Sequence, residues 1–534
     1  MTENNTYDFI VIGSGPGGSV ISSRLTENNS VSVLLLEAGS NSIPEASRSP
    51  FRWNEMLLGE YDWAYFSEEQ PFLDNRRVYS AAGKMPGGTS GIYHMIHTRG
   101  KREDYDNWSY NGCDGWSYKD VLPYLQKLEN QVDNTNPEGG KNGPINVINA
   151  KDQGNPISES FLEACSELGY PLVKDFNDAT KPGNNMGAGW HHVNIKNGER
   201  WGVYKGYLEP ALSRSNLTFS TDSLVTKLII QEKKCIGVQY IKDGQTLKAF
   251  ANNEVVLSAG AIQSPKILMH SGIGDPEVLK ENDISISHDL PGVGKNFHDH
   301  PLIIGPMILL NNPGLDPKGN MTEVALFWKS FESMTCPDME ITMVHRAPFG
   351  ENFFDNVSKR AETGLPVNDV KELVNPRVIL TLPGLMRPLS RGSVTLKGSD
   401  PLAAPIVDCN YFSEDIDLER MVKMIHIGRS IYQTPTMKSL GAVEIGPGDS
   451  VQSEDELRQW VKTNVGSYYH FVGSCKMGRD NMSVVDPSLC VRGLNKLRVV
   501  DASVMPTITA ANTHTSTVMI GEKAADLIKK NYGI

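Results

Sequence analysis

The sequence of 534 residues has few cysteines, and they form no recognisable pattern. They are seven in number, which is odd, and no two are spaced as C-x-x-C. They stand at positions 113, 165, 235, 336, 409, 475 and 490. This scatter argues against a disulfide framework and against a zinc site. We therefore expect a chain without a bound metal that works in the reducing cytoplasm.

Long apolar runs and blocks of one charge are also missing. Residues 1–6 do not combine a basic start with an apolar run, and later apolar stretches are far shorter than the roughly 20 residues of a membrane helix. Lys and Arg number 51 against 63 Asp and Glu, which gives a formal net charge of −12. Without a basic stripe, nucleic acid and anionic membranes are poor candidate partners. We expect no export signal and no membrane span.

Several glycines lie near the start of the chain, between two apolar runs. Residues 7–12 are rich in β-branched side chains and end at the turn 13–18, after which apolar residues recur at helical spacing. A second apolar run over 31–36 stops at Glu37, 24 positions after Gly13. This order predicts a strand, a tight turn, a helix and a parallel strand, which is the unit that binds dinucleotides.

Each residue of this motif has a physical task. Gly13 permits the sharp turn, Gly15 lets backbone N–H groups approach a pyrophosphate, and Gly18 allows close packing of the helix on the strand. Glu37 can accept hydrogen bonds from the ribose hydroxyls. The motif fits NAD or FAD, and its N-terminal position, followed by Glu-Ala-Gly at 37–39, favours a flavin.

The remaining chain alternates between several patterns. Residues 41–75 are polar and aromatic without periodicity, which is typical of a long surface excursion, and 83–91 form a second glycine-rich loop. Short β runs fill 217–258, and helices are expected from 260 to about 270 and from 516 to 530. No repeat is visible. The alternation predicts a discontinuous nucleotide-binding domain with a second domain inserted in pieces.

Taken together, the motifs resemble the glucose-methanol-choline (GMC) flavin oxidoreductases. Residues 260–274, GAIQSPKILMHSGIG, match the second signature of that family at every constrained position. The resemblance implies an α/β fold with a Rossmann-like FAD-binding domain and an α+β substrate-binding domain built on an antiparallel sheet and helices. We place the FAD-binding domain at residues 1–45, 75–100, 205–305 and 480–534, and the substrate-binding domain at 46–74, 101–204 and 306–479.

Residues 83–99 resemble the family's first signature, with departures. Pro86 replaces a usual aliphatic residue, and Tyr93 stands where an Asn or His usually contacts the flavin. Some relatives bond FAD covalently through a His at the position of Ile92. Isoleucine cannot form that bond, so the resemblance implies non-covalent FAD. His94 stands where substrate-side groups occur in relatives, and an ordinary polar loop residue is the alternative interpretation.

The resemblance also implies further cofactor contacts. Gly88 belongs to the loop suited to close approach of a planar ligand, and Val225 stands where relatives contact adenine through the backbone. Asp501 and Ala502 would contact the phosphate and ribityl region, mostly through the backbone. Asn512 would contact the flavin or the last turn through its side chain.

Two histidines near the C-terminus carry the expected chemistry. His470 precedes a Gly-Ser-Cys-Lys-Met-Gly turn that resembles the family's active-site segment, and His514 occupies the second catalytic position, which is His or Asn across the family. Oxidation of an alcohol needs a base near the hydroxyl and a hydride acceptor near the carbon. We assign these roles to His470 and flavin N5, with His514 as a hydrogen-bond partner of the hydroxyl oxygen. Tyr469 is expected to line the substrate pocket, with core packing as the alternative.

The predicted function is an FAD-dependent oxidase that converts a primary alcohol to an aldehyde and reduces O₂ to H₂O₂. The His/His pair is typical of sugar and aryl-alcohol oxidases, whereas choline-type members usually carry His/Asn. Two alternatives stay open: a dehydrogenase that uses a quinone or another acceptor, and a hydroxynitrile lyase that keeps FAD without redox turnover. Aromatic residues over 53–66 and 468–471 hint at an aryl or otherwise apolar alcohol.

Overall fold

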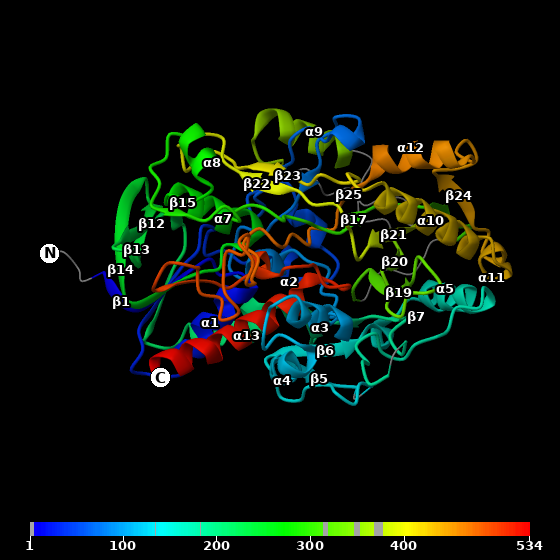
Figure 1. Ribbon diagram of the computed structural model, residues 1–534. Helices are drawn as coiled ribbons and strands as arrows, with labels where there is room; N and C mark the ends of the chain where they lie inside the picture. The colour runs from blue at the N-terminus through cyan, green and yellow to red at the C-terminus, as the bar shows by residue number, and fades with distance from the viewer. Residues whose placement is uncertain (1–4, 134, 182, 313–318, 347–352, 368–376) are drawn as a thin grey trace.

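The computed structural model describes residues 5–133, 135–181, 183–312, 319–346, 353–367 and 377–534, and it contains two large sheets side by side (Figure 1). The first sheet has the strand order β11-β2-β1-β14-β13-β12, and β26 pairs with β14. Its strands are β1 (Thr6–Ile12), β2 (Val33–Leu36), β11 (Leu217–Ser220), β12 (Leu224–Gln231), β13 (Lys234–Lys242), β14 (Gln245–Leu257) and β26 (Leu497–Val499).

The N-terminal unit has the predicted parallel arrangement. Strand β1 lies between β2 and β14 and is parallel to both. Phe9, Ile10 and Val11 of β1 are fully buried, as expected for a parallel strand covered on both faces. Helix α1 (Pro16–Leu25) begins with proline at its first position and packs beside the C-terminal helix α13 (Thr513–Tyr532) (Figure 1).

The second large sheet is antiparallel, with the order β24-β18-β21-β20-β19-β7, and β17 pairs with both β21 and β25. Its strands are β7 (Gly187–Trp190), β17 (Pro301–Leu302), β18 (Met307–Leu309), β19 (Thr322–Trp328), β20 (Met339–Val344), β21 (Val378–Leu385), β24 (Val443–Gly446) and β25 (Gly466–Ser467). Helices α5 (Pro156–Glu167) and α10 (Asp415–Tyr432) pack against it. The predicted α/β class with an antiparallel second sheet is confirmed.

Shorter elements connect and cover the two sheets. The other helices are α2 (Glu45–Arg48), α3 (Arg102–Tyr110), α4 (Tyr118–Leu128), α6 (Glu209–Ala211), α7 (Gly260–His270), α8 (Pro276–Glu281), α9 (Phe353–Thr363), α11 (Pro435–Ser439) and α12 (Glu454–Asn464). The short strands are β3 (Tyr65–Phe66), β4 (Tyr79–Ser80), β5 (Glu129–Gln131), β6 (Ile145–Asn149), β8 (His192–Val193), β9 (Ile195–Lys196), β10 (Glu199–Arg200), β15 (Ile273–Gly274), β16 (His288–Asp289), β22 (Ser393–Thr395) and β23 (Ile406–Asp408).

Two expectations about local structure need correction. The segment 41–75 is not a surface excursion, because Trp53, Leu57 and Leu58 are buried in a hydrophobic cluster that includes residues of β20 and β21. Its aromatic residues have no period because they pack in different clusters, Trp53 in this one and Tyr65 in a second. The last helix begins at Thr513, three residues earlier than expected, which places His514 in its first turn.

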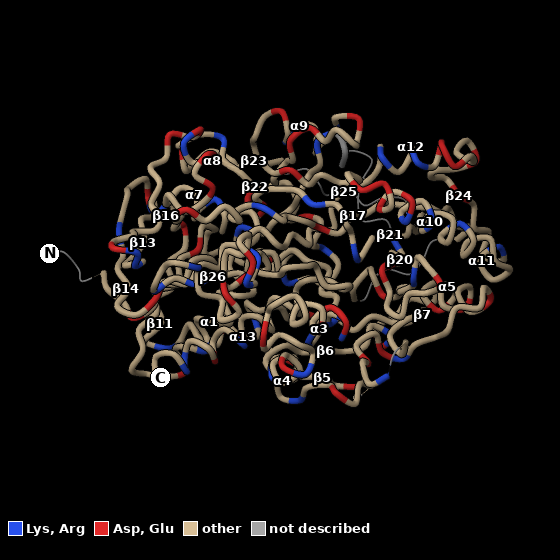
Figure 2. The backbone as a smooth tube through the Cα atoms, viewed as in Figure 1, with Lys and Arg blue, Asp and Glu red and all other residues tan. Residues whose placement is uncertain are grey.

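Acidic and basic residues are interspersed along the backbone, as the colours of Figure 2 show for α10 and α12. None of the described helices is long and apolar enough to cross a bilayer. Within the described ranges, no three His, Cys, Asp or Glu side chains gather as metal ligands, and all seven cysteines are free thiols.

Candidate functional site

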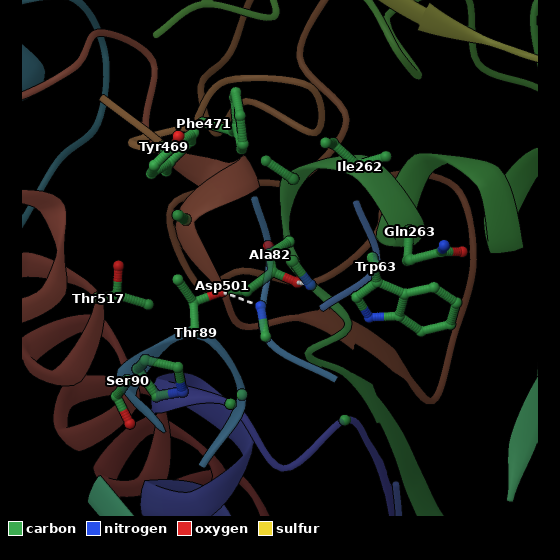
Figure 3. A pocket seen from close by; sticks show the side chains of 18 of the residues that line it. Trp63, Ala82, Thr89, Ser90, Ile262, Gln263, Tyr469, Phe471, Asp501 and Thr517 are labelled. Carbon is green, nitrogen blue, oxygen red and sulfur yellow. Dashed lines mark hydrogen bonds between the residues drawn. The ribbon is translucent and has the colours of Figure 1, made fainter. Parts of the chain in front are cut away.

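One large cavity runs from the β1–α1 turn to the two C-terminal histidines. Its empty space is about 1800 Å³, including the part that opens to solvent. Figure 3 shows Trp63 and Gln263 on one side of it and Tyr469 and Phe471 on another. The structure brings twelve of the thirteen predicted site residues to its wall: Gly13, Gly15, Glu37, Gly88, His94, Val225, Tyr469, His470, Asp501, Ala502, Asn512 and His514.

The glycines of the first turn divide into packing positions and one open position. Gly13 has a φ of +91°, and a Cβ there would lie 2.5 Å from the Ser258 carbonyl oxygen. A Cβ on Gly18 would overlap the Gly13 carbonyl, so this residue lies beneath the turn, outside the cavity wall. At Gly15, no described atom lies within 4 Å of the Cβ position. The space beside Gly15 is therefore open, and a ligand could approach the backbone at the N-terminus of α1 there.

The second glycine loop packs directly on the first. Gly88 has a φ of +54°, and a Cβ there would lie 2.8 Å from Gly15 Cα. The Gly87 amide donates a hydrogen bond of 3.1 Å to the Ser14 carbonyl. Two loops some 70 residues apart in sequence thus form one floor made largely of backbone.

Two buried carboxylates are held at this floor by backbone and hydroxyl donors. Glu37 accepts hydrogen bonds from the Ser14 amide at 2.9 Å, the Ser14 hydroxyl at 2.6 Å and the Gly39 amide at 2.8 Å. Asp501 accepts from the Gly260 amide at 2.9 Å, at the start of α7. Burial raises the pKa of both carboxyl groups. Because the Asp501 side chain is occupied in this way, a ligand nearby would meet mainly its backbone.

His470 is held on several sides. Its Nδ1 lies 2.9 Å from His300 Nδ1, and its backbone amide donates to Asp299 Oδ1 at 2.7 Å. The Tyr468 ring is stacked on the imidazole with centroids 4.6 Å apart. On the other side of the ring, Nε2 lies 3.4 Å from Asn512 Nδ2. Burial holds the pKa of His470 well below its usual range, so the ring is uncharged at neutral pH.

His514 has free hydrogen-bonding capacity. Both ring nitrogens are shielded from solvent, and neither has a hydrogen-bond partner among the described residues. The ring packs on Tyr93 with centroids 4.5 Å apart, and the Tyr93 hydroxyl donates to Asn194 Oδ1 at 3.0 Å. Burial lowers the pKa of His514 to about 3. Buried polar groups are nearly always paired in proteins, so the free nitrogens of His514 indicate a ligand-binding position.

The two residues predicted to face the substrate both lie on the cavity wall. His94 packs on Trp53 with ring centroids 3.9 Å apart, and burial lowers its pKa to about 3. Tyr469 has a φ of +62°, which is unusual for a bulky residue and indicates backbone strain at the cavity wall. Its ring lies 5.9 Å from that of Tyr79.

Sequence reasoning did not place three residues around the histidines. Trp53 was assigned to a surface segment, and Tyr468 was considered only among the aromatic residues that hint at an apolar alcohol. No role was given to His300. The sequence does contain a signal for His300. Residues 293–296, Val-Gly-Lys-Asn, together with Asp299 and His300 also resemble a segment of the GMC family. Nothing in the sequence, however, shows that His300 meets a residue 170 positions away.

A flavin dinucleotide fits this set of residues. The open position at Gly15 and the N-terminus of α1 suit a pyrophosphate, and Glu37 closes the end of β2 where a ribose would lie. The unpaired nitrogens of His514 and the unpaired Oδ1 of Asn512 lie at the other end of the same cavity. The wall therefore supplies polar groups at both ends of an elongated ligand.

Comparison with known proteins agrees with the geometry. Residues 7–302 and 388–521 match the N- and C-terminal models of GMC oxidoreductase. An oxygen-dependent choline dehydrogenase 1 of Chromohalobacter salexigens is 35% identical over 99% of this chain and 96% of its own length. An oxygen-dependent choline dehydrogenase of Escherichia coli O157:H7 is 36% identical over 98% of this chain and 94% of its own. The crystal structure of pyridoxine 4-oxidase from Mesorbium loti superposes with a TM-score of 0.88 at 28% identity, covering 97% and 98% of the two chains.

The mode of FAD attachment is a first testable prediction. Ile92 lines the cavity, and its saturated side chain offers no atom for a covalent bond to a flavin. The purified protein should therefore be yellow and should release all of its FAD into the supernatant on acid precipitation. Absorbance of the pellet and the supernatant measures this directly. Flavin that stays with the denatured chain would contradict the prediction.

Proposed function

Because the chain belongs to the GMC oxidoreductase family and is an FAD-dependent enzyme acting on CH–OH groups, we propose that it oxidises an apolar primary alcohol to the aldehyde and passes the electrons to O₂. The observation that carries this proposal is the meeting of His470 and His514 in one apolar-walled cavity. In the overall reaction one alcohol and one O₂ give one aldehyde and one H₂O₂.

The two histidines take different parts in this reaction. His470 Nε2 accepts the hydroxyl proton, and its low pKa keeps it unprotonated and ready at neutral pH. His514 uses one of its unpaired nitrogens to donate a hydrogen bond to the substrate oxygen as negative charge develops there. Bound FAD supplies the hydride acceptor.

The walls near the histidines support an apolar substrate. Five apolar side chains of the cavity come from one hydrophobic cluster: Trp53, Leu57, Ile92, Leu302 and Leu382. Burial keeps His94 and His514 uncharged at neutral pH, so these rings add polarity without charge. A hydrocarbon or aryl group attached to the alcohol would bury its surface against this wall, which is worth about 25 cal/mol per Å² of apolar area.

Choline is the second candidate substrate, because two relatives at 35% and 36% identity are named as choline dehydrogenases. Choline and 3,3-dimethylbutan-1-ol have the same shape and differ in that a quaternary nitrogen replaces a carbon. Aromatic rings such as Trp53 can attract a cation, so the comparison is a direct test of the wall.

We expect the neutral alcohol to have a kcat/KM at least about tenfold higher than choline, which corresponds to about 1.4 kcal/mol. H₂O₂ should be formed in equal amount to the aldehyde. A higher kcat/KM for choline would contradict the apolar alcohol and identify choline as the preferred substrate. Reduction of a dye without formation of H₂O₂ would indicate a dehydrogenase. If no alcohol bleached the flavin under anaerobic conditions, the hydroxynitrile lyase would be the remaining alternative.

Substitutions at His514 should separate its role from that of a base. His514→Asn keeps a hydrogen-bond donor close to the same place, whereas His514→Ala does not. The asparagine variant should therefore retain a higher rate of flavin bleaching, by about 1–3 kcal/mol of transition-state stabilisation. At position 470 the same two substitutions should be almost equally damaging, because asparagine is no base. Stopped-flow bleaching of all four variants tests this, and equal rescue at both positions would contradict it.

A further inference from the structure

His300 contacts the side of His470 that faces away from the cavity, and it does not itself line the cavity. It is fully buried and is absent from the cavity wall. Strand pairing explains how it arrives there: β17 runs antiparallel to β25, with Pro301 opposite Ser467, and His298 bridges to Val472. The segment before β17 therefore lies alongside 468–472.

The hydrogen bonds of the two rings define where their protons are. His300 Nε2 lies 3.1 Å from the Met386 carbonyl oxygen, which can only accept, so Nε2 carries the proton. Burial lowers the pKa of His300 to about 3, so the ring is neutral and its Nδ1 is a bare acceptor. The contact of 2.9 Å between the two Nδ1 atoms then requires the proton of His470 to be on its own Nδ1.

The contact on the opposite side of His470 is consistent with this position of the proton. With its proton on Nδ1, neutral His470 has a lone pair on Nε2. The amide nitrogen that faces Nε2 is Asn512 Nδ2, a donor, at 3.4 Å. A donor at this place matches an unprotonated Nε2 and would clash electrostatically with a protonated one.

We propose that His300 is a positioning residue that keeps the ring proton of His470 on Nδ1, so that Nε2 presents its lone pair to the substrate hydroxyl. The inference rests on the proposed role of His470 as the base. In the reaction the hydroxyl O–H bond breaks and an N–H bond forms at Nε2. His300 gains no proton, and its Nδ1 accepts a hydrogen bond from the imidazolium that His470 becomes.

Two variants of His300 test this role. Asparagine places its Oδ1 near the position of Nδ1 and can still accept from His470, whereas leucine cannot. His298→Leu is the matched control, because His298 is equally buried but bonds only to the main chain, at Asn296 O and Ile508 N. Its loss should lower stability without changing the protonation of His470.

The position of the His470 proton can be measured by ¹⁵N NMR of the FAD-loaded protein labelled at histidine, and a merely structural role of His300 would not change it. The His470 signals are assigned by their disappearance in His470→Gln. We expect wild type, His300→Asn and His298→Leu to show His470 protonated at Nδ1. His300→Leu should lose this preference. Its rate of alcohol-dependent bleaching should fall by about 10- to 10⁴-fold, the upper limit being the cost when a catalytic imidazole has the wrong tautomer, and His300→Asn should recover most of it.

The proposal is overturned if wild-type His470 carries its proton on Nε2, or if His300→Leu keeps both the Nδ1 proton and the wild-type rate. It is also overturned if His300→Asn keeps the Nδ1 proton but is as slow as His300→Leu. If His300→Leu does not fold, the spectra of wild type and His300→Asn still show which nitrogen of His470 carries the proton. Because these spectra need no turnover, they separate a failure here from a failure of the proposed function, in which no alcohol would bleach the wild-type flavin.

Discussion

Replacing His470 by alanine should slow alcohol-dependent bleaching of the flavin by about 10²–10⁴-fold, the range for removal of a general base. This corresponds to about 3–5 kcal/mol in the barrier. The loss should be large because the other groups near the substrate cannot replace His470. His94 packs on Trp53 and His514 packs on Tyr93, so neither imidazole occupies the place of His470 Nε2. Stopped-flow absorbance under anaerobic conditions measures the rate.

His426→Ala is a suitable control for this variant. His426 lies on α10 and is exposed, with Glu454 as its partner. It should bleach at the wild-type rate. The His470→Ala protein should still contain FAD in a 1:1 ratio, because the floor of the cavity at Gly13, Gly15 and Gly88 is untouched. A wild-type bleaching rate in His470→Ala would refute the assignment of His470 as the base.

Gly15→Val should abolish FAD binding and leave the fold intact. The φ of Gly15 is −66°, which any residue can adopt, and no described atom lies within 4 Å of its Cβ position. The new side chain would therefore point into the cavity, at the N-terminus of α1 where the pyrophosphate is expected. The FAD-free variant should differ from FAD-free wild type by no more than about 1 kcal/mol in stability, since Gly15 is the N-cap of α1 and valine is a poorer cap.

Gly17→Ala gives the opposite outcome and serves as the comparison. A Cβ at Gly17 would overlap the Val500 carbonyl oxygen, so the protein itself has no room for it. This variant should lose about 1–3 kcal/mol of stability as an overpacked site. Thermal unfolding of the FAD-free proteins and their flavin content distinguish the two effects. A folded Gly15→Val protein with full flavin content would disprove the assigned role of Gly15.

The local patterns were sufficient for elements whose partners lie close in sequence. The strand at 7–12, a turn that starts at Gly13 and the helix at 260–270 are all present, because glycine placement and apolar periodicity act within one turn or one strand. The turn is shorter than 13–18, since α1 already begins at Pro16. The start of α13 was predicted three residues late, since Thr513, His514 and Thr515 lack a helical apolar pattern. Trp53 was misplaced because a buried residue in an irregular segment leaves no periodic signal.

The sequence by itself determined the dinucleotide-binding turn, the family resemblance and the two histidines, because each depends on residue types at short, regular spacing. Only the tertiary structure decided which residues surround those histidines. His300 reaches His470 through the pairing of β17 with β25, and Asn512 reaches Nε2 from the start of α13. Such contacts arise from strand register and helix packing across more than 40 residues, and a change of one position in the β17 register would turn His300 away from His470.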